Sequence, residues 1–298
     1  MELLVTGGTV FVSRYIAEFF ADKGHTVYVL NRGSRPQAPN VTPIIADRHS
    51  LGNKLKHFTF DAVIDVTSYD QNDVDDLLNG LEHFDRYILI SSSAVYPENT
   101  LPPFSEKVPT GPNSIWKSYG TGKKAAEEAL LKRVPDAYIL RPPYLCGPMN
   151  NLYREAFVFE CAELDMPFYI PQKGEMKLQF CHIGDLSRFI EIIISRTPQN
   201  HTFNIGYPEP VRTIDWIDMC YKAVGKAPAY RYVPENIPQR SYFPFYDYEY
   251  ILDVSEMLAL MNDLTPLQQS LNSSYEWFRN NRELIVRKPF FRYIEEKL

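Results

Sequence analysis

The sequence predicts an α/β fold: a doubly wound parallel sheet with a smaller, sequence-discontinuous C-terminal lobe. Three observations predict this fold class. Short apolar runs alternate with helical patterns through the amino half, which is typical of βαβ units. The first apolar run leads through Thr6-Gly7-Gly8-Thr9 into a helical pattern, as doubly wound sheets do at their ligand site. After Pro142 the pattern becomes irregular and rich in proline, which indicates a separate lobe.

The strands of the sheet are predicted at seven apolar runs, in chain order ELLVTG, TVYVLN, TPIIAD, AVIDVT, YILISS, AYILRP and TFNIG. Helical patterns fall between them at about 12–23, 71–83, 118–133 and 185–196. Right-handed crossovers then connect the parallel strands. The later part of the chain predicts helices at 215–224, 253–261 and 267–280, and the tail VRKPFFRYIEEKL is expected to form a helix that packs on the lobe.

Two domains are predicted, each built from two segments, because the strand TFNIG returns to the sheet between the two irregular stretches. Residues 1–145 and 181–206 are assigned to the sheet domain. Residues 146–180 and 207–298 are assigned to the lobe.

Composition places the chain among ordinary globular proteins. It has 298 residues, of which 45% are hydrophobic, so it can bury a large core. The net charge is −6 and there is no long basic run, so a general nucleic-acid binder is not expected. No His, Cys or Asp cluster has metal-ligand spacing, so no metal is predicted. The four cysteines lack CxxC spacing and are expected to be reduced thiols: Cys146, Cys161, Cys181 and Cys220.

A cytoplasmic location is expected. The sequence starts with a strand, MELLVTGG, which leaves no room for a signal peptide. No apolar run approaches the ~20 residues of a membrane span, so no membrane association is predicted.

A candidate catalytic set follows the fifth strand. Three serines, Ser91 to Ser93, end that strand, and an alanine-rich helix begins later with Tyr119-Gly-Thr-Gly-Lys123. Residues at i and i+4 share one face of a helix, so the Lys123 ammonium can sit beside the Tyr119 phenol. We expect this charge to lower the pKa of the phenol and make it a usable acid or base.

Two other Tyr-Lys pairs have the same spacing. Tyr169 and Lys173 flank Pro171, which disfavours a shared helix. Tyr293 and Lys297 have no strand or serine cluster before them. Only Tyr119 therefore has the context of a site, although a tyrosine that packs on the sheet with a solvated lysine is the alternative.

Seven segments of the chain, in this order, resemble the extended short-chain dehydrogenase/reductases, the family of sugar-nucleotide epimerases and dehydratases. They are TGGTVFVSR, FDAVIDVTSY, ISSSAVYP, YGTGKKAAEEAL, LRPPYLCGP, QFCHIGDL and FNIGYPEPV. The segments GGTVF, NRG and FPFYDYEYILDVS are similar to the branch that holds the chloroplast stem-loop-binding proteins and their bacterial relatives. The resemblance implies a Rossmann-type sheet domain that binds NAD or NADP and a lobe that binds substrate.

The resemblance also implies a cofactor site. The family pattern GxxGxxG reads Gly7, Val10 and Ser13 here, so only the first glycine is kept. Because the second strand ends in Asn31-Arg32-Gly-Ser-Arg35, without the acid that usually contacts the ribose, NADP is favoured over NAD. A solvated basic loop is the alternative. The cofactor-binding candidates are Gly7, Thr9, Val10, Phe11, Val12, Asn31, Arg32, Arg35, Asp47, Ser91, Tyr119, Lys123 and Pro142.

By the same resemblance Ser92, Tyr119 and Lys123 are the catalytic residues. Tyr119 is the acid or base, and Lys123 holds the nicotinamide ribose. Dehydratases of the family carry an acid pair after the catalytic serine or threonine, but this chain has Ser93 and Ala94 there, which disfavours dehydration. The substrate-binding candidates are Ser93, Tyr144, Asn150, Asn151, Lys177 and Arg240.

The functional prediction is an NAD(P)-dependent epimerase or oxidoreductase that transfers a hydride to or from a hydroxyl or carbonyl of a sugar or sugar nucleotide. The alternative is an RNA-associated or cofactor-sensing binding module on the same fold, with little or no turnover. The acidic net charge counts against an RNA partner. A homodimer is an expectation that comes from the family alone.

Overall fold

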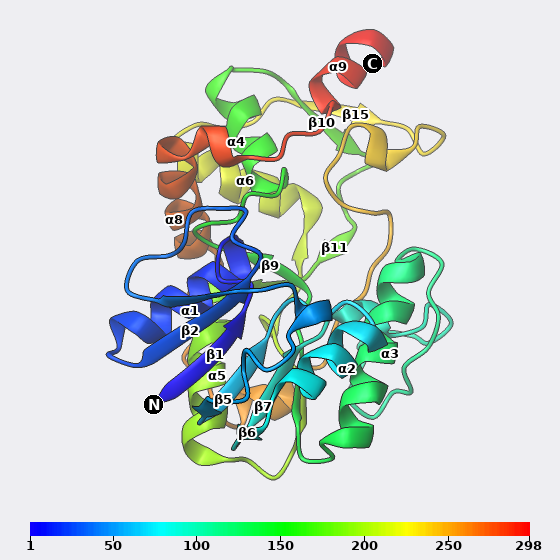
Figure 1. Cartoon of the computed structure of the whole chain (residues 1–298). Helices are drawn as coiled ribbons and strands as arrows, with labels where there is room; N and C mark the ends of the chain where they lie inside the picture. The colour runs from blue at the N-terminus through cyan, green and yellow to red at the C-terminus, as the bar shows by residue number, and fades with distance from the viewer.

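The computed structural model describes residues 1–298 and has a seven-stranded sheet at its centre (Figure 1). All strand pairs in this sheet are parallel. In spatial order the strands are β13 (Thr202–Asn204), β8 (Tyr138–Arg141), β7 (Tyr87–Ile90), β5 (Ala62–Asp65), β1 (Glu2–Thr6), β2 (Thr26–Asn31) and β3 (Thr42–Ile45). The order reverses between β1 and β5, so the ligand crevice of such a sheet is expected at their carboxyl ends.

Helices cover both faces of the sheet. On one face α1 (Phe11–Asp22) lies against α5 (Ile183–Arg196), and on the other α2 (Gln71–Gly80) lies against α3 (Lys117–Arg133). Successive strand residues point to opposite faces, so Leu3 and Val5 join one hydrophobic core while Leu4 joins the other. The continuous apolar runs of the strands follow from burial on both sides.

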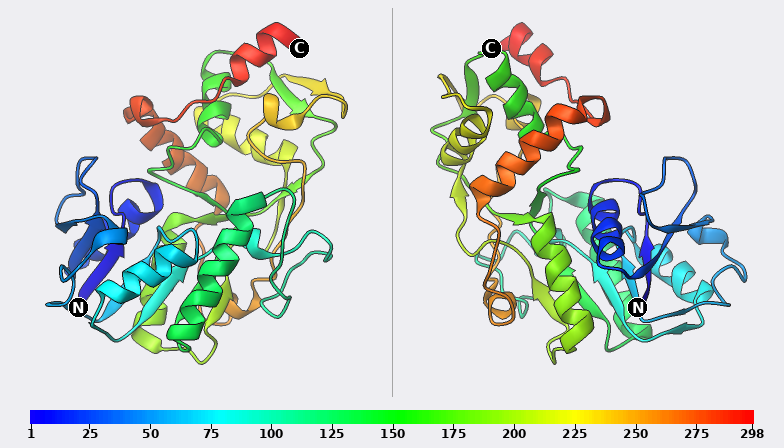
Figure 2. Two further views of the ribbon diagram at one scale, coloured as in Figure 1. Left: turned by 45° about the vertical axis from the view of Figure 1, so that its right-hand side comes forward. Right: turned by 90° about the vertical axis from the view of Figure 1, so that its left-hand side faces the viewer.

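The lobe lies beyond the carboxyl ends of the strands, at the top of Figure 1, far from the amino terminus. Figure 2 shows the same separation from two other sides. The lobe contains α4 (Glu155–Glu163), α6 (Thr213–Val224), α8 (Leu267–Asn280), α9 (Phe290–Lys297) and the strand pair β10 (Phe168–Pro171) and β15 (Tyr230–Val233). Its core is continuous with the α1 and α5 side of the sheet, so the two parts are packed together.

Several short elements complete the chain. The remaining strands pair two by two: β9 (Tyr144–Cys146) with β12 (Phe180–His182), β11 (Lys177–Leu178) with β14 (Val211–Arg212), and β4 (Thr59–Phe60) with β6 (His83–Phe84). Short helical turns occur at Arg48–Ser50, Ser93–Val95, Gln239–Ser241, Ser255–Leu258 (α7) and Arg282–Leu284.

The predicted fold class is confirmed, and all seven predicted strands lie in the central sheet. TFNIG does return to the sheet, where β13 pairs with β8. Two expectations need correction. The stretch before Phe180 is not irregular throughout, because it contains α4, and the helix expected at 253–261 is only one turn, Ser255–Leu258.

The tail forms α9, as predicted, and it packs on the lobe through Phe290, whose ring centroid lies 5.0 Å from that of Phe157 on α4. None of the helices is long and apolar enough to cross a membrane.

Candidate active site

A cleft of about 520 Å³ runs along the carboxyl edge of the sheet, below the lobe. The chain brings five segments to it: the loop after β1, the loop after β5, the serine cluster after β7, the start of α3, and the first residues of the lobe. Many of the predicted site residues line this one cleft, namely Gly7, Thr9, Val10, Phe11, Val12, Ser91, Ser92, Ser93, Tyr119, Lys123, Pro142, Tyr144 and Asn151.

The loop after β1 needs glycine at two positions. Gly7 and Gly8 have φ values of +92° and +78°, which L residues with side chains rarely adopt. A Cβ atom on Gly7 would lie 2.7 Å from Ser13 Oγ, and one on Gly8 would lie 2.5 Å from Val29 Cγ1. Val10, which replaces the second glycine of the family pattern, has φ −139° and ψ 139°. Because any residue adopts this extended conformation, the backbone does not require glycine there.

Two glycines between Tyr119 and Lys123 allow α3 to approach the ends of the strands. A Cβ atom on Gly120 would lie 2.5 Å from the carbonyl oxygen of Ala94, and one on Gly122 would lie 2.5 Å from that of Tyr69. Such contacts are too short for any larger residue unless the backbone moves. The spacing of the motif therefore follows from packing as well as from chemistry.

Tyr119 reaches into the cleft beside Ser92. The residue is 41% exposed, and desolvation of its phenol raises the pKa. A hydrogen bond with the Ser92 side chain and the positive charge of Arg154 offset part of this rise, whereas Tyr69 adds to it. Tyr119 and Ser92 thus lie in the same cleft.

Lys123 occupies a different environment from the one predicted. The residue is only 2% exposed, and its Nζ donates to the carbonyl oxygens of Ser68 at 2.6 Å and Ile90 at 2.9 Å. Burial lowers its pKa to about 8, while Asp65 and Glu127 oppose the shift. The expectation that Lys123 lowers the pKa of Tyr119 is therefore not met in this arrangement. Its charge is directed to backbone carbonyls, and the cation that acts on the phenol is Arg154.

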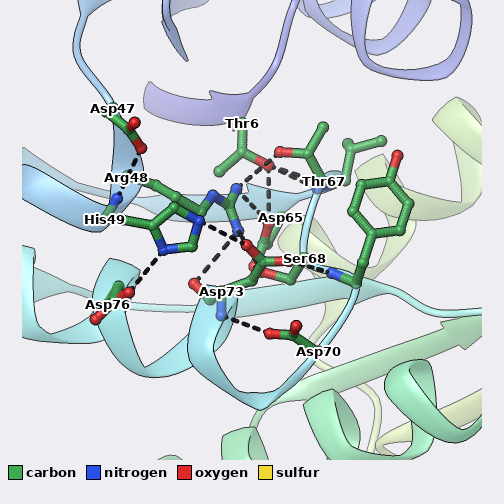
Figure 3. A network of polar contacts seen from close by, with 12 residues as sticks. Thr6, Asp47, Arg48, His49, Asp65, Thr67, Ser68, Asp70, Asp73 and Asp76 are labelled. Atoms are coloured by element: carbon green, nitrogen blue, oxygen red, sulfur yellow. Dashed lines mark hydrogen bonds and ion pairs between the residues drawn. The ribbon is translucent and has the colours of Figure 1, made fainter. Parts of the chain in front are cut away.

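Beside Lys123 a fully buried carboxylate, Asp65, ends strand β5 (Figure 3). It accepts hydrogen bonds from the hydroxyl groups of Thr6 at 2.8 Å, Tyr87 at 2.6 Å and Ser68, and Arg48 Nη2 lies 3.4 Å away. Burial alone would raise the pKa of Asp65, but Arg48 and the three hydroxyl donors outweigh it and lower the pKa. Asp65 is thus a buried anion with a full set of partners.

A second buried charge pair lies one turn further along α3. Glu127 accepts two hydrogen bonds from Arg141 at the end of β8, at 3.0 and 2.6 Å, and one from the hydroxyl of Ser91. Arg141 also donates to the Tyr96 hydroxyl at 2.9 Å. The Ser91 side chain is therefore engaged inside the protein, although Ser91 borders the cleft. Tyr119, Lys123 and Glu127 form one stripe along the inner face of α3.

A second hollow, of about 390 Å³, adjoins the first and is lined by Gly7, Thr9 and Thr67 together with the segment after β2 and the turn after β3. Arg32 and Arg35 line it, and neither forms an ion pair in the structure. Asp47 also lines it and caps the following turn by accepting from the His49 backbone N–H at 3.0 Å. Asn31 instead stabilises the loops: its amide donates to the carbonyl oxygen of Gly7 and to Gln37.

Three predicted substrate-binding residues do not line the cleft. Asn150 is buried; its amide donates to Glu155 at 2.8 Å and its oxygen accepts from the backbone of Leu152 at 3.1 Å. Lys177 is an exposed residue of β11. Arg240 stacks on the ring of Tyr246, with 4.6 Å between the guanidinium carbon and the ring centroid, and donates to backbone carbonyls nearby.

The sequence analysis missed Arg154, which lines the cleft and stacks on Tyr144 with its guanidinium carbon 4.7 Å from the ring centroid. It has no carboxylate partner. None of the residues that line the cleft is Asp or Glu, and its two cations are Lys123 and Arg154. An arginine in an apparently irregular stretch gave no signal that could have found it. The cleft is therefore suited to an anionic ligand.

The residues present fit a nicotinamide dinucleotide. The loop before α1 leads into a helix start, where backbone amide groups bind a pyrophosphate, and Gly7 and Gly8 let this loop pack closely on Ser13 and Val29. The hollow with Arg32 and Arg35 continues from it toward the end of β3. No group of three or more His, Cys, Asp or Glu side chains could hold a metal ion.

Solved structures share this architecture. UDP-glucuronic acid 4-epimerase from Bacillus cereus, in complex with UDP-glucuronic acid and NAD, superposes with a TM-score of 0.73 at 20% identity, over 94% of this chain and 99% of the other. UDP-glucose 4-epimerase from Thermotoga maritima, with UDP-glucose, superposes with a TM-score of 0.76 at 18% identity, over 95% and 100%. Likeness at this level of identity establishes the fold.

The sequence also matches characterised proteins and a family as a whole. The chain is 25% identical over 279 residues to the chloroplast stem-loop binding protein of 41 kDa b from Arabidopsis thaliana, which covers 86% of this chain and 72% of that protein. The predicted resemblance to that branch is thereby confirmed. The sequence model of the NAD dependent epimerase/dehydratase family matches residues 3–206, from the first strand to the end of the last strand of the sheet. The chain belongs to the NAD-dependent epimerase/dehydratase family.

Proposed function

We propose that the protein is an NAD(P)-dependent epimerase or oxidoreductase that acts on a hydroxyl or carbonyl group of a sugar nucleotide. The observation that carries this proposal is that Ser92, Tyr119 and Lys123 line the same cleft as the glycine loop. When bound, the nicotinamide accepts a hydride from the substrate or returns one to it. Family membership and the UDP-sugar complexes of structural neighbours support the same class of reaction.

Each residue of the set has a distinct task. The Tyr119 phenol exchanges a proton with the substrate oxygen whose carbon gains or loses the hydride, and the Ser92 hydroxyl donates a hydrogen bond to that oxygen. Lys123 keeps one of its three N–H donors after it has bound the carbonyls of Ser68 and Ile90, and this donor is available for the ribose. Because the phenol has a raised pKa in the free protein, it is the proton-donating form that predominates at neutral pH.

Electrostatics supports an anionic substrate such as a sugar nucleotide. The cleft has two cations and no carboxylate. The Arg154 side chain has neither an ion pair nor a hydrogen bond within the protein, so its guanidinium is free to bind a phosphate or carboxylate oxygen. Net dehydration is disfavoured, because Ser93 and Ala94 stand where the family's dehydratases carry acids.

NADP is the proposed cofactor, with NAD as the alternative. Arg32 and Arg35 line the hollow beside the glycine loop, and Asn31 at the end of β2 offers no carboxylate to a ribose. We also propose the domain division given above, with residues 1–145 and 181–206 in the cofactor domain and the rest in the substrate lobe.

The proposal is tested by incubating the protein with UDP-glucose, UDP-galactose or UDP-glucuronic acid and each cofactor, and following the sugar protons by NMR. A new epimer, or a product with stoichiometric change in cofactor absorbance, is expected. The Tyr119→Phe variant should lose this activity and Tyr293→Phe should keep it, because Tyr293 has the same Tyr-Lys spacing far from the cleft. No conversion of any sugar nucleotide, although both cofactors bind, would contradict the proposal.

A binding role is the second candidate, since the name of the Arabidopsis relative is that of a stem-loop binding protein. The net charge of −6 makes an RNA partner unfavourable. Filter binding of a stem-loop RNA over a range of salt concentrations distinguishes the two, because a true complex weakens steeply as salt rises. Salt-sensitive binding without any turnover would favour this second candidate.

A further inference from the structure

The Arg48 side chain connects two parts of the site that the sequence gives no reason to link. Arg48 lies in the turn after β3 and lines the hollow that also contains Arg32 and Arg35. Its guanidinium group points toward the end of strand β5 (Figure 3). An arginine at the edge of a proposed cofactor site is thus directed into the protein.

The guanidinium binds the loop that follows β5. It donates to Thr67 Oγ1 at 2.7 Å and to Ser68 Oγ at 2.6 Å, and its Nη2 lies 3.4 Å from Asp65. It also donates to the carbonyl oxygen of Asp73 at 3.3 Å. These contacts fix three polar side chains within four residues, those of Asp65, Thr67 and Ser68, because a planar guanidinium presents its donors in a rigid fork.

The same loop holds Lys123. The Ser68 carbonyl oxygen accepts a hydrogen bond from Lys123 Nζ at 2.6 Å, and the ring centroid of Tyr69 lies 5.0 Å from this atom. The Ser68 side chain, in turn, lies between Arg48 and Asp65 and bonds both. A displacement of the loop would therefore move the carbonyl group to which the ammonium is bound.

We propose that Arg48 is a positioning residue for Lys123, acting through Ser68 and Asp65. The bridge runs from the hollow at the end of β3, through the loop after β5, to the inner face of α3. The contribution of this bridge to the reaction rests on the function proposed above. The contacts that form the bridge can be measured whether or not the protein turns over a substrate. The alternative is that Arg48 only neutralises the buried Asp65 and stabilises the fold.

Charge provides a measurement that separates these two roles. The groups that act on Lys123 come from four elements: Asp65 on β5, Glu127 on α3, Asp73 on α2 and Arg48 after β3. After desolvation, Asp65 and Glu127 raise the pKa of Lys123 and Arg48 lowers it. Removing the Arg48 charge should therefore raise this pKa from about 8, whereas removing the Asp65 charge should lower it further.

The experiment is ¹⁵N NMR of the lysine side-chain amino groups as a function of pH in the full-length protein, with Lys123→Gln used to assign the signal. Arg48→Gln keeps a hydrogen-bond donor but no charge, and its Lys123 pKa should rise. Arg48→Lys keeps the charge but not the planar fork, so the loop after β5 should shift and the Lys123 signal should move or broaden, whereas a role in charge neutralisation alone predicts the wild-type value. Arg133→Gln is the matched control, because Arg133 pairs with Asp75 at the exposed end of α3 and does not contact the loop after β5.

An unchanged Lys123 pKa in a folded Arg48→Gln variant would overturn the proposal. So would a wild-type Lys123 signal in Arg48→Lys, since it would show that the charge alone accounts for the effect of Arg48. If Arg48→Gln does not fold, Thr67→Val removes one contact of Arg48 and should broaden or shift the Lys123 signal, while an unchanged signal would again count against the bridge. None of these NMR measurements requires enzymatic activity. Failure of the proposed function would therefore appear separately, as an absence of turnover in a protein whose Lys123 pKa still responds to Arg48 substitution.

Discussion

The Nζ atom of Lys123 lies 2.6 Å from the carbonyl oxygen of Ser68, which lies three residues after Asp65, the last residue of β5. Because of this contact, the ammonium binds backbone carbonyl oxygens and does not pair directly with Tyr119, one turn earlier on the helix. The contact also explains how a lysine that is 98% covered can remain in the protein, because carbonyl oxygens compensate its lost hydration. The lysine is held by the backbone before any ligand arrives.

Replacement of Tyr119 by Phe should lower turnover by about 10²- to 10⁴-fold, the usual contribution of a general acid or base. Cofactor affinity should change little, because only the phenolic oxygen is lost. Lys123→Ala should weaken both turnover and cofactor binding, and Ser92→Ala should fall between the two in turnover. Steady-state kinetics and calorimetric titration measure these effects. A Tyr119→Phe variant that retains more than about a tenth of the activity would contradict the assignment.

Binding of NADP(H) should be tighter than binding of NAD(H), because Arg32 and Arg35 have no carboxylate partner in the hollow that they line. Charge-assisted hydrogen bonds are worth about 1.5–3 kcal/mol each. Calorimetric titration of the wild type and of Arg32→Ala and Arg35→Ala with both cofactors decides the question. Arg292→Ala, which changes an exposed arginine on α9, is the control. Equal affinity for the two cofactors would indicate that Arg32 and Arg35 are solvated and do not bind the cofactor phosphate.

Gly122→Ala should destabilise the protein, although alanine ordinarily stabilises a helix by about 0.5–1 kcal/mol relative to glycine. The new Cβ would lie 2.5 Å from the carbonyl oxygen of Tyr69, so α3 or the loop must move, at a cost of about 1–3 kcal/mol. Cofactor affinity should fall with it, because Lys123 moves with the helix. Thr121→Ala, an exposed neighbour on the same helix, is the control for chemical denaturation. Unchanged or increased stability in Gly122→Ala would show that the close approach is relaxed in solution.

The stability of the protein should depend on pH because the Glu155 carboxyl group is buried. Burial raises the pKa of this carboxyl group to about 7, and Asn150 donates to it. The unfolded chain releases the same proton near pH 4.5, so between these values the folded protein holds more protons and loses stability as the pH rises. Relative to Glu155→Gln, the wild type should lose up to about 3 kcal/mol across this interval. Urea unfolding from pH 4.5 to 8 measures it, with the exposed Glu128→Gln as control, and a constant difference between wild type and Glu155→Gln would contradict it.

Arg141→Met should cost about 3–5 kcal/mol of unfolding free energy, because it leaves the Glu127 carboxylate buried without its cation. The double variant Glu127→Gln with Arg141→Met should recover part of this loss, since it removes both charges. Denaturant unfolding of the two single variants and the double variant forms a complete cycle. Additive losses in the double variant would show that the pair does not act as a unit.

The parts of the molecule that the sequence predicted well are those that depend on local pattern. Apolar runs located every strand of the central sheet: the inner strands are apolar because they are buried on both faces, and the largely exposed edge strand β3 still carries an apolar run. Tyr119 was predicted from helix periodicity and from the serine-ended strand before it, whereas Ser92 was selected among the three serines by the family resemblance. The helix α4 was missed, since its sequence is apolar nearly all round and offers no amphipathic stripe.

The parts that could not be predicted depend on contacts between distant segments. Arg48 appears in the sequence as one more charged loop residue, and its pairing with Asp65 appears only when β3 and β5 are placed in the sheet. The partner of Lys123 is a carbonyl group, which every residue has, so no residue type marks it. Asn150 was expected to contact substrate because it is polar and follows a turn, but it satisfies the buried Glu155 instead.

Tyr119, Lys123 and Glu127 follow one another at intervals of four along α3, and each is engaged by a different part of the protein: the cleft, the loop after β5, and the end of β8. An insertion or deletion of one residue between any two of them would rotate the following part of the helix by about 100°. It would therefore expose a buried ammonium or a buried carboxylate to apolar surroundings at the same time as it separates the reactive groups. Length changes in this helix therefore disturb two buried charges at once, whereas the turn at residues 99–101 of the preceding loop, where Leu101 is 87% exposed, is a better place for insertions.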